Sequence, residues 1–420
     1  MQKFKKIFSP RSMIIWVSLL VLVISFQYTN QPAQSQTQAI ATALAVDATD
    51  DNKIEVSAVI LTPIQSSSSK RKAYTAQGVD ITNALNEISL QLGKQIGFGQ
   101  CDIMAIGDKL CEEDALKMLD YLTRTKRVGR NAVLLNFSGK TEDFANCVVQ
   151  LNDNMSLNVA EIINFNRKYI VASETNIEAF FKGYYSELGL SIMPKVKISE
   201  TEEANSIKIQ AGDMSSPQPE NNSNAGTSSE NSNQQSKELY FSNDGTTSIF
   251  RNGKKFTEIE PEELKYINLL QPQNVLGTFK LEHINSELLN DARVVIDLTN
   301  KEMNYKLSFK DGKPKISYDL DLYILIDEIV ETEKNENLLH TENWFADDSV
   351  VNALTNKIEE NLDVVVTKLQ DEKIDMIEIY NKFYKFKNKK FKKFLNTLED
   401  KQDFLKSVEF EYKIKIHSSY

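Results

Sequence analysis

The chain has 420 residues, more than one ordinary hydrophobic core serves, so we expect two or three domains. Hydrophobic residues make up 41% and charged residues 26%, which is typical of a folded globular body. The formal net charge of -10 argues against a protein built to hold nucleic acid, because phosphate binding needs a basic surface.

The N-terminus has the layout of an exported or membrane-anchored chain. Four basic residues come first: Lys3, Lys5, Lys6 and Arg11. An apolar run from Met13 to Phe26 follows, shorter than the roughly 20 residues of a comfortable span. No A-x-A-like cleavage motif follows it, so we favour an uncleaved signal anchor with a polar linker over residues 1–36 and the remaining chain outside the cytoplasm. The alternative is a secreted protein cleaved near Ala33.

The next region begins with two predicted strands. Residues 39–46 and 53–61 are apolar enough for strands, and the polar stretch 47–52 between them favours a tight reversal. This turn is acidic, but it lacks the glycine that an EF-hand calcium loop requires, so we expect a solvated turn. Residues 66–72, which read SSSSKRK, are predicted to form a flexible loop.

Helices and strands then alternate. The spacing of apolar residues predicts a helix over 81–92 with Asp80 as its N-cap. A buried strand at 101–107, a helix at 112–122 and a strand at 131–137 follow. This alternation predicts a mixed α/β domain over residues 37–140.

One resemblance to a nucleotide site is rejected. The strand ending at Phe137 runs into Gly139, Lys140 and Thr141, as a phosphate-binding loop would. The pattern requires glycine at position 134, where Leu134 stands, and without it the backbone does not wrap phosphates. We therefore expect no nucleotide here.

A middle domain is predicted over residues 141–237. Apolar residues repeat with helical spacing over 173–189, with Ser173 as a candidate N-cap and Gly189 as the stop. Residues 213–237 are rich in Ser and Asn and contain almost nothing apolar, which predicts a disordered insertion.

The C-terminal region, residues 238–420, alternates apolar and polar residues in several runs. Turn signals at Asn252-Gly253 and Asp311-Gly312 predict two hairpins of a half-buried antiparallel sheet. A long helix follows; the apolar positions that predict it are Val351, Leu354, Ile358, Leu362, Val365 and Leu369. The alternating run at 408–416 predicts a closing strand, and the region reads as an α+β domain.

Residues 380–395 combine seven lysines with aromatic residues and contain no acidic residue. The simplest interpretation is one helix whose apolar side packs on the sheet while its lysines stay in water. The expected packing residues are Tyr384, Phe391, Phe394 and Leu395, and the expected exposed ones are Lys385, Lys389 and Lys392. Contact with a lipid surface is the main alternative, and contact with nucleic acid is a weaker one.

No catalytic or metal-binding motif stands out. Cys101, Cys111 and Cys147 have no C-x-x-C spacing, so they read as buried or free thiols, although an oxidising compartment would permit a bridge between the first two. His283, His340 and His417 read as surface residues. Acidic pairs such as Glu112 and Glu113 do not reveal a hydrolase without a cleft. We therefore expect no catalytic, cofactor-binding or metal-binding residues, no cofactor and no enzymatic activity.

Several stretches do point to a family. AIATALAVDATDDNKIEVSAVIL, QGVDITNALNEISLQLGKQIGFGQCDIMAIGDKL and ALKMLDYLTRTKRVGRNAVLL resemble the N-terminal part of the Ger(x)C family, the C subunit of spore germinant receptors. TSIFRNGKKFTEIEPEELKYINLL, the hairpin around DGKPKI, the long helix and the stretch from KIDMIEIYNKF to VEFEYKIKI follow that family's order of elements. The resemblance covers nearly all of the chain outside the anchor and the insertion.

The resemblance implies three mixed α/β domains and no enzymatic activity. It also implies a place on the outer face of the inner spore membrane, beside integral membrane A and B subunits, in nutrient-triggered germination. The sequence departs from the family in lacking the lipobox cysteine, and SFQYTNQPAQSQTQ stands in its place. The Met13–Phe26 segment would then replace the lipid anchor. The alternative function is an anchored extracytoplasmic protein that binds a small ligand.

Overall fold

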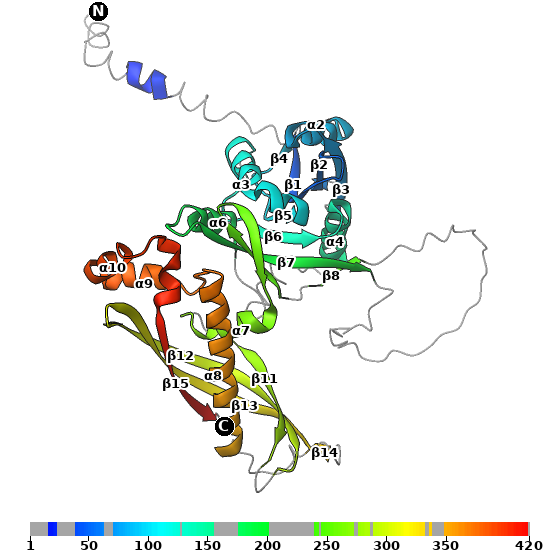
Figure 1. The fold of residues 1–420 in the computed structure, drawn as a ribbon. Helices are drawn as coiled ribbons and strands as arrows, with labels where there is room; N and C mark the ends of the chain where they lie inside the picture. Colours follow the sequence, from blue (N-terminus) through cyan, green and yellow to red (C-terminus); the bar gives the residue numbers. More distant parts are fainter. Residues whose placement is uncertain are drawn as a thin grey trace, which may run out of the picture.

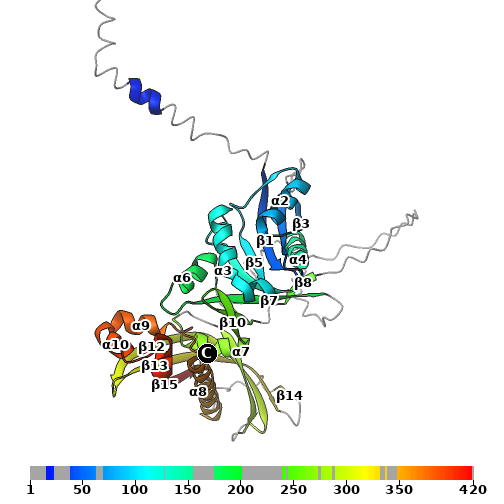
Figure 2. The same ribbon diagram turned by 45° about the horizontal axis from the view of Figure 1, so that its top comes forward.

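The computed structural model describes residues 16–22, 38–62, 70–126, 128–154, 175–200, 239–242, 245–272, 276–285, 289–331, 336–337 and 348–418. These residues form two β-sheets with flanking helices, and one sheet lies above the other in the views of Figures 1 and 2. Of the predicted anchor, only residues 16–22 are described, and they are helical. The predicted insertion at 213–237 lies outside the described residues. Within the described ranges, no helix has both the length and the apolarity needed to span a bilayer.

The first sheet has ten strands. They are β1 (Gln38–Ala48), β2 (Ile54–Thr62), β3 (Lys70–Gly78), β4 (Gln95–Gly97), β5 (Ile103–Gly107), β6 (Val133–Ser138), β7 (Leu190–Glu200), β8 (Leu239–Ser242), β9 (Thr247–Arg251) and β10 (Lys254–Ile259). Their order is β10-β9-β7-β6-β5-β1-β2-β3, with β4 paired to β1 and β8 to β7. The central strands β1, β5, β6 and β7 run parallel, while β2, β3, β8, β9 and β10 pair antiparallel.

Helices cover both faces of this sheet. Those that belong to it are α2 (Ile81–Leu92), α3 (Asp108–Thr125), α4 (Thr141–Asn154) and α6 (Ile177–Tyr184). Because side chains alternate along a strand, Leu44 and Val46 of β1 share a core with α2, α3 and α6, while Ala43 and Ala45 share another with α4. The result is a three-layer α/β/α arrangement (Figure 1), and the predicted mixed α/β architecture is confirmed.

Most predicted elements of this region form. The Asp80 side chain caps α2 by accepting the Asn83 N–H at 2.8 Å, as expected. The loop predicted at 66–72 is wrong at its end, because β3 begins at Lys70. Among the described strands it pairs with β2 alone, at the edge of the sheet, and its lysines and small residues leave little apolar signal. The helix predicted over 173–189 is shorter, and Asn176 caps it by accepting the Ala179 N–H at 2.8 Å, whereas Ser173 lies outside the described residues.

An ion-pair network ties distant segments of this sheet together. Asp108, at the start of α3, lies 2.9 Å from Lys255 of β10 and 3.4 Å from Lys195 of β7. Both lysines also contact Glu258, and the Ser138 hydroxyl donates to Asp108. Burial opposes ionisation, but these donors hold the pKa of Asp108 below its usual value. The network therefore fastens β10 to the carboxyl end of the parallel strands.

Strands on both sides of residues 140 and 237, where the sequence predicts domain boundaries, belong to this one sheet. The parallel pairing of β6 with β7 carries the sheet past the first position. The hairpin predicted at Asn252-Gly253 is confirmed, with positive φ at both residues. Its predicted place in the C-terminal sheet is wrong, because β9 pairs with β7 of the first sheet. The division of the chain into three domains stays a prediction.

The second sheet has five strands. They are β11 (Gly277–Ile284), β12 (Ala292–Lys310), β13 (Lys313–Glu331), β14 (Glu336–Asn337) and β15 (Glu409–Ser418). The hairpin predicted at Asp311-Gly312 is confirmed and joins two strands of 19 residues. The antiparallel sheet predicted here is correct for β11 to β14 and wrong for β15, which runs parallel to β13. A parallel pair requires a crossover, which the helices before β15 supply.

Those helices cover one face of the second sheet. They are α7 (Pro261–Leu269), α8 (Asp348–Asp371), α9 (Ile379–Phe386), α10 (Asn388–Leu395) and the 3-10 helix η2 (Lys401–Ser407). The predicted apolar stripe of α8 is buried, except that Val350 takes the place of Val351. The opposite face of the sheet is polar and carries ion pairs such as Lys315–Glu409 at 2.8 Å and His417–Asp321 at 2.8 Å. The sheet is thus half-buried, as predicted.

Lys301 is a buried cation in this core. A bulge after Leu298 in β12 shifts the alternation, so Lys301 points inward in line with Met303. Its ammonium donates to the carbonyls of Asn268 at 2.7 Å and Gln271 at 2.6 Å, at the end of α7. A cation at a helix C-terminus satisfies carbonyls that the helix itself leaves unpaired. Lys301 therefore attaches the end of α7 to the second sheet through these hydrogen bonds.

Candidate functional site

The N-terminal part is built on the first sheet and the C-terminal part on the second sheet. They meet along α6, β7 and β9 on one side and the segment after α8 on the other. Arg251, at the end of β9, donates to the Glu372 carbonyl at 2.7 Å and to the Lys373 carbonyl at 3.3 Å. Its guanidinium also stacks on the Phe256 ring, 4.0 Å from the centroid. Apolar Ile249 of β9 belongs to the hydrophobic core of the C-terminal part. The junction is therefore both packed and hydrogen-bonded.

A cleft of about 430 Å³ lies at this junction. One wall comes from α6 and β7, and the other from residues 374–381. Its apolar lining comes from Leu188, Leu190, Ile192, Ile249, Ile374 and Met376. Its charged lining comes from Lys182, Glu187, Asp375 and Glu378. Pockets of this size, with apolar walls and a few polar groups, hold small ligands in other proteins. We take the cleft as the candidate site.

The two elements of the first wall, α6 and β7, approach each other closely because of Gly183 in α6. A Cβ at this position would lie 2.2 Å from the Leu190 carbonyl oxygen and 2.9 Å from the Ser191 hydroxyl. Only glycine lets the helix backbone reach β7 at this distance. The Ser191 hydroxyl donates to the Phe180 carbonyl at 2.7 Å, and the Ser186 hydroxyl donates to the Gly183 carbonyl at 2.6 Å. Both hydroxyls are therefore engaged in hydrogen bonds to backbone carbonyls.

Asp375 organises the opposite wall. Its two carboxylate oxygens accept the Ile379 and Tyr380 N–H groups, each at 2.7 Å, at the start of α9. Burial raises the pKa of Asp375 to about 6, although these hydrogen bonds and nearby Lys382 oppose the rise. A carboxylate suits the positive end of a helix. Asp375 thus caps α9 and gives the cleft a group whose pKa is about 6.

Replacing this cap should loosen α9. We expect Asp375→Ala to lower the free energy of unfolding by about 2 kcal/mol, because two N–H groups lose their acceptor. Asp375→Asn keeps one acceptor oxygen and should cost less. Urea unfolding measures the loss, and hydrogen exchange should place it in α9. Equal stability of the alanine variant and the parent would contradict the capping role.

The same group predicts a pH dependence. Its folded pKa of about 6 lies above the ordinary value of 3.8, so between these values the folded chain holds the extra proton. The contribution of Asp375 to stability is therefore largest in acid and falls as the pH rises from about 4 to 6. The midpoint of urea unfolding should therefore decrease from pH 4 to 6 in the parent chain. This decrease should be absent in Asp375→Asn.

The residues considered for chemistry in the sequence lie apart from this cleft. Cys101, Cys111 and Cys147 are free and buried, and burial raises the pKa of all three thiols, that of Cys101 and Cys147 to about 12. Such thiols are unreactive. Glu112 and Glu113 are exposed on α3.

The two described histidines, His283 and His417, do not line the cleft either. His283 is exposed on β11 and lies 2.6 Å from Asp291, whose carboxylate raises the pKa of the imidazole. His417 of β15 stacks on Tyr323 of β13. His340 lies outside the described residues. Within the described ranges, no three His, Cys, Asp or Glu residues form a group that could hold a metal ion.

The Gly139-Lys140-Thr141 stretch has a structural role, in which Thr141 joins α4 to β2. Thr141 is buried and its hydroxyl donates to Glu55 at 2.5 Å, while Ser57 donates to Thr141 at 2.9 Å. Because these hydrogen bonds occupy the Thr141 hydroxyl, it is not free to bind a metal ion beside a phosphate.

The basic segment 380–395 departs from its prediction. It forms two helices, α9 and α10, which meet at Lys387. Phe391, Phe394 and Leu395 are buried as expected. The burial predicted for Tyr384 is wrong, since its exposed fraction is 42%. The break turns this side chain outward, and the sequence carried no turn residue such as glycine or proline to reveal it.

The sequence matches two family models. Residues 33–198 match the spore germination protein N-terminal domain, and residues 245–419 match the spore germination B3/GerAC-like C-terminal domain. Together these define a class of spore germination proteins, and they cover most of the chain. The protein belongs to the Ger(x)C family of spore germination proteins, as its sequence suggested.

A search of curated proteins found no match. Among solved structures, the chain is similar to one described as the crystal structure of the GerBC protein, with 12% identity and a TM-score of 0.49. The similarity covers 90% of this chain and 97% of that one.

Proposed function

We propose that this chain is a non-enzymatic, membrane-anchored subunit of a spore germinant receptor complex. It would act on the extracytoplasmic face of the inner spore membrane, beside integral membrane A and B subunits. Membership of the Ger(x)C family is the observation that carries the proposal. The N-terminal apolar run supports the anchor, because Met13–Phe26 follows basic residues that favour the cytoplasmic side.

The chemistry of the cleft supports a role in binding. Asp375 caps a helix, and Ser186 and Ser191 donate to backbone carbonyls. A catalytic hydroxyl would instead contact a base that activates it. Each of these groups therefore stabilises the wall to which it belongs, which suits a preformed binding site better than a catalytic one.

Crosslinking in intact spores tests the proposal. The full chain should capture polytopic membrane proteins, and spores that lack it should respond poorly to nutrients while retaining nutrient-independent germination. Arg251→Ala, which weakens the junction, should reduce the response, and exposed Lys53→Gln should leave it unchanged. Normal nutrient germination in the deletion strain together with no captured membrane partner would overturn the proposal.

The cleft favours a second function, the binding of a small ligand between the two parts. Its volume of about 430 Å³ and its mixed lining suit a small amphiphilic molecule such as an amino acid. A ligand that binds only the native state raises the melting temperature by mass action. A shift with amino acids that Asp375→Asn diminishes would support this function, and no shift across such compounds would contradict it.

A further inference from the structure

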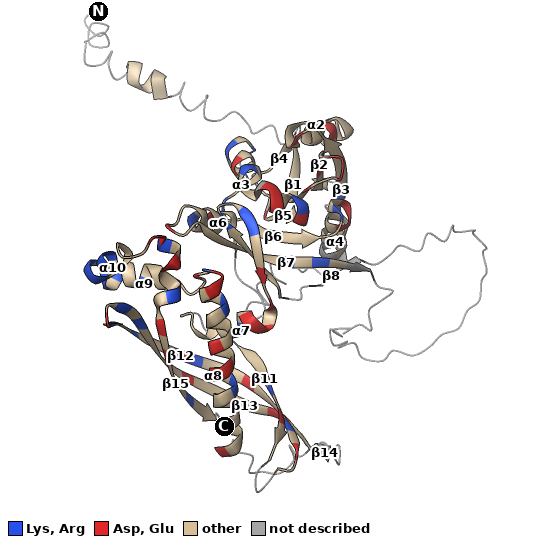
Figure 3. Cartoon of the chain, viewed as in Figure 1, with Lys and Arg blue, Asp and Glu red and all other residues tan. Residues whose placement is uncertain are grey.

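The outer side of α9 and α10 carries charge that the fold does not neutralise. We define the α9–α10 surface by its exposed residues: Tyr384, Lys385, Phe386, Lys387, Lys389, Lys390, Lys392 and Lys393. Among the described residues, none of its six lysines forms an ion pair. Four of them, Lys389, Lys390, Lys392 and Lys393, belong to α10, which is largely blue in Figure 3.

Packing does not explain the lysines. The apolar sides of both helices are already buried in the core through Tyr380, Phe383, Phe391, Phe394 and Leu395. On α10 the lysines lie on the opposite side, where Lys389 and Lys393 are one helical turn apart. Like charges at this spacing destabilise a helix. By contrast, α8 mixes both signs, for example Lys357 with Glu360.

Two aromatic side chains accompany the charge. Phe386 has an exposed fraction of 57% and Tyr384 of 42%. Lys385 lies 5.2 Å from the Phe386 ring centroid, and Lys392 lies 5.2 Å from that of Tyr384. Exposed aromatic rings beside lysines are the pattern of surfaces that lie at the boundary between lipid headgroups and acyl chains.

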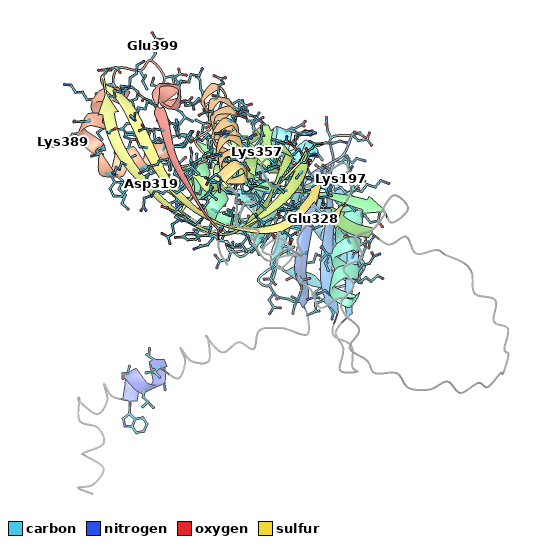
Figure 4. All side chains as sticks on the ribbon, turned by 90° about the horizontal axis from the view of Figure 1, so that it is seen from below. Lys197, Asp319, Glu328, Lys357, Lys389 and Glu399 are labelled. Atoms are coloured by element: carbon cyan, nitrogen blue, oxygen red, sulfur yellow. The ribbon has the colours of Figure 1, made fainter. Side chains whose placement is uncertain are left out.

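The position of the surface suits a flat partner. In both ribbon views α10 lies at the outer edge of the C-terminal part (Figures 1 and 2). Lys389 lies at the rim of the described chain when it is seen from below (Figure 4). The net charge of -10 would repel most of the protein from an anionic bilayer, so a local basic surface would also set its orientation.

We infer that the α9–α10 surface docks on the anionic headgroups of a lipid bilayer, with Tyr384 and Phe386 entering the interface. Each lysine near such a surface contributes about a fivefold gain in affinity. The inference stands apart from the N-terminal anchor, because it depends on lipid charge and the anchor depends on apolar length.

The test uses the full chain on two kinds of vesicle. One is phosphatidylcholine alone and the other is an equimolar mixture of phosphatidylcholine and phosphatidylglycerol. A water-soluble amine reagent labels exposed lysines, and mass spectrometry reads each site. We expect labelling of the α9–α10 lysines to slow several-fold on the mixed vesicles only, and high salt should restore it. Equal labelling on both vesicles, with the chain bound to each, would overturn the docking and leave the anchor intact.

A matched pair of variants completes the test. Lys389→Gln/Lys390→Gln/Lys393→Gln removes three charges with little change in helix propensity and should lower the affinity of the surface about 100-fold. Protection of the remaining lysines there should then disappear. The control Lys53→Gln/Lys94→Gln/Lys140→Gln removes three exposed charges elsewhere and should keep it. Protection that rises with protein concentration without vesicles would assign the surface to contact between copies of this chain and overturn the lipid assignment.

Discussion

Lys301→Met should lower the free energy of unfolding by about 3 kcal/mol, one of the two largest effects that we expect in this protein. The substitution keeps the apolar stem but removes the donor that the Asn268 and Gln271 carbonyls share. These carbonyls lie at the end of α7, so the loss should free that helix from β12. Urea unfolding of the full chain measures the change.

A control on the same strand separates charge from burial. Lys306 is exposed on the other face of β12, so Lys306→Met should change stability by less than about 0.5 kcal/mol. An equal effect of the two substitutions would show that Lys301 holds nothing in place.

The same lysine predicts a pH dependence with a definite sign. Burial lowers the pKa of Lys301 from 10.5 to about 8. Between these values the unfolded chain holds the extra proton, so the contribution of Lys301 to stability rises with pH. The difference in unfolding free energy between the parent and Lys301→Met should therefore widen from pH 8 to 10.5 and level off above. A constant difference would contradict the buried environment of the amine.

Arg251→Ala should uncouple the two parts of the molecule and cost about 3 kcal/mol. The alanine removes hydrogen bonds to the Glu372 and Lys373 carbonyls and the stacking on Phe256. Because Arg251 links the first sheet to the segment after α8, we expect calorimetry to resolve two unfolding transitions in the variant. Hydrogen exchange should rise in residues 372–381, which include one wall of the cleft.

Arg251→Lys is the informative control. Lysine keeps the positive charge but lacks the planar fork that reaches two carbonyls and stacks on a ring. We expect it to recover less than half of the loss. Full recovery would mean that charge alone acts at the junction, and an unchanged single transition in the alanine variant would mean that the apolar contacts of Ile249 suffice.

Local patterns in the sequence predicted much of the fold. The hairpins at Asn252-Gly253 and Asp311-Gly312 formed where expected, because these residues adopt the positive φ angles that tight turns require. The stripe on α8 and the cap at Asp80 were also confirmed. Such signals involve a few neighbouring residues and depend little on the remaining chain. The family, too, was evident from the order of the elements.

The candidate site was not predictable in the same way. Arg251 and Asp375 act through hydrogen bonds to backbone groups rather than through a motif. Outside the cleft, Lys301 was equally hidden, since it faces inward because of a bulge. A hydrogen bond to a carbonyl leaves no pattern of residue types in the sequence. The exposure of Tyr384 likewise depends on the angle at which α10 packs after α9.

The sequence by itself determined the local structure and the family of this protein. The tertiary structure alone decided that β7 lies between β6 and β9, that β15 runs parallel to β13, and that a cleft opens between the two parts. The physical reason is the range of the interactions. Turn and helix preferences act over a few residues, whereas strand partners and helix angles are chosen by the packing free energy of segments far apart in the chain.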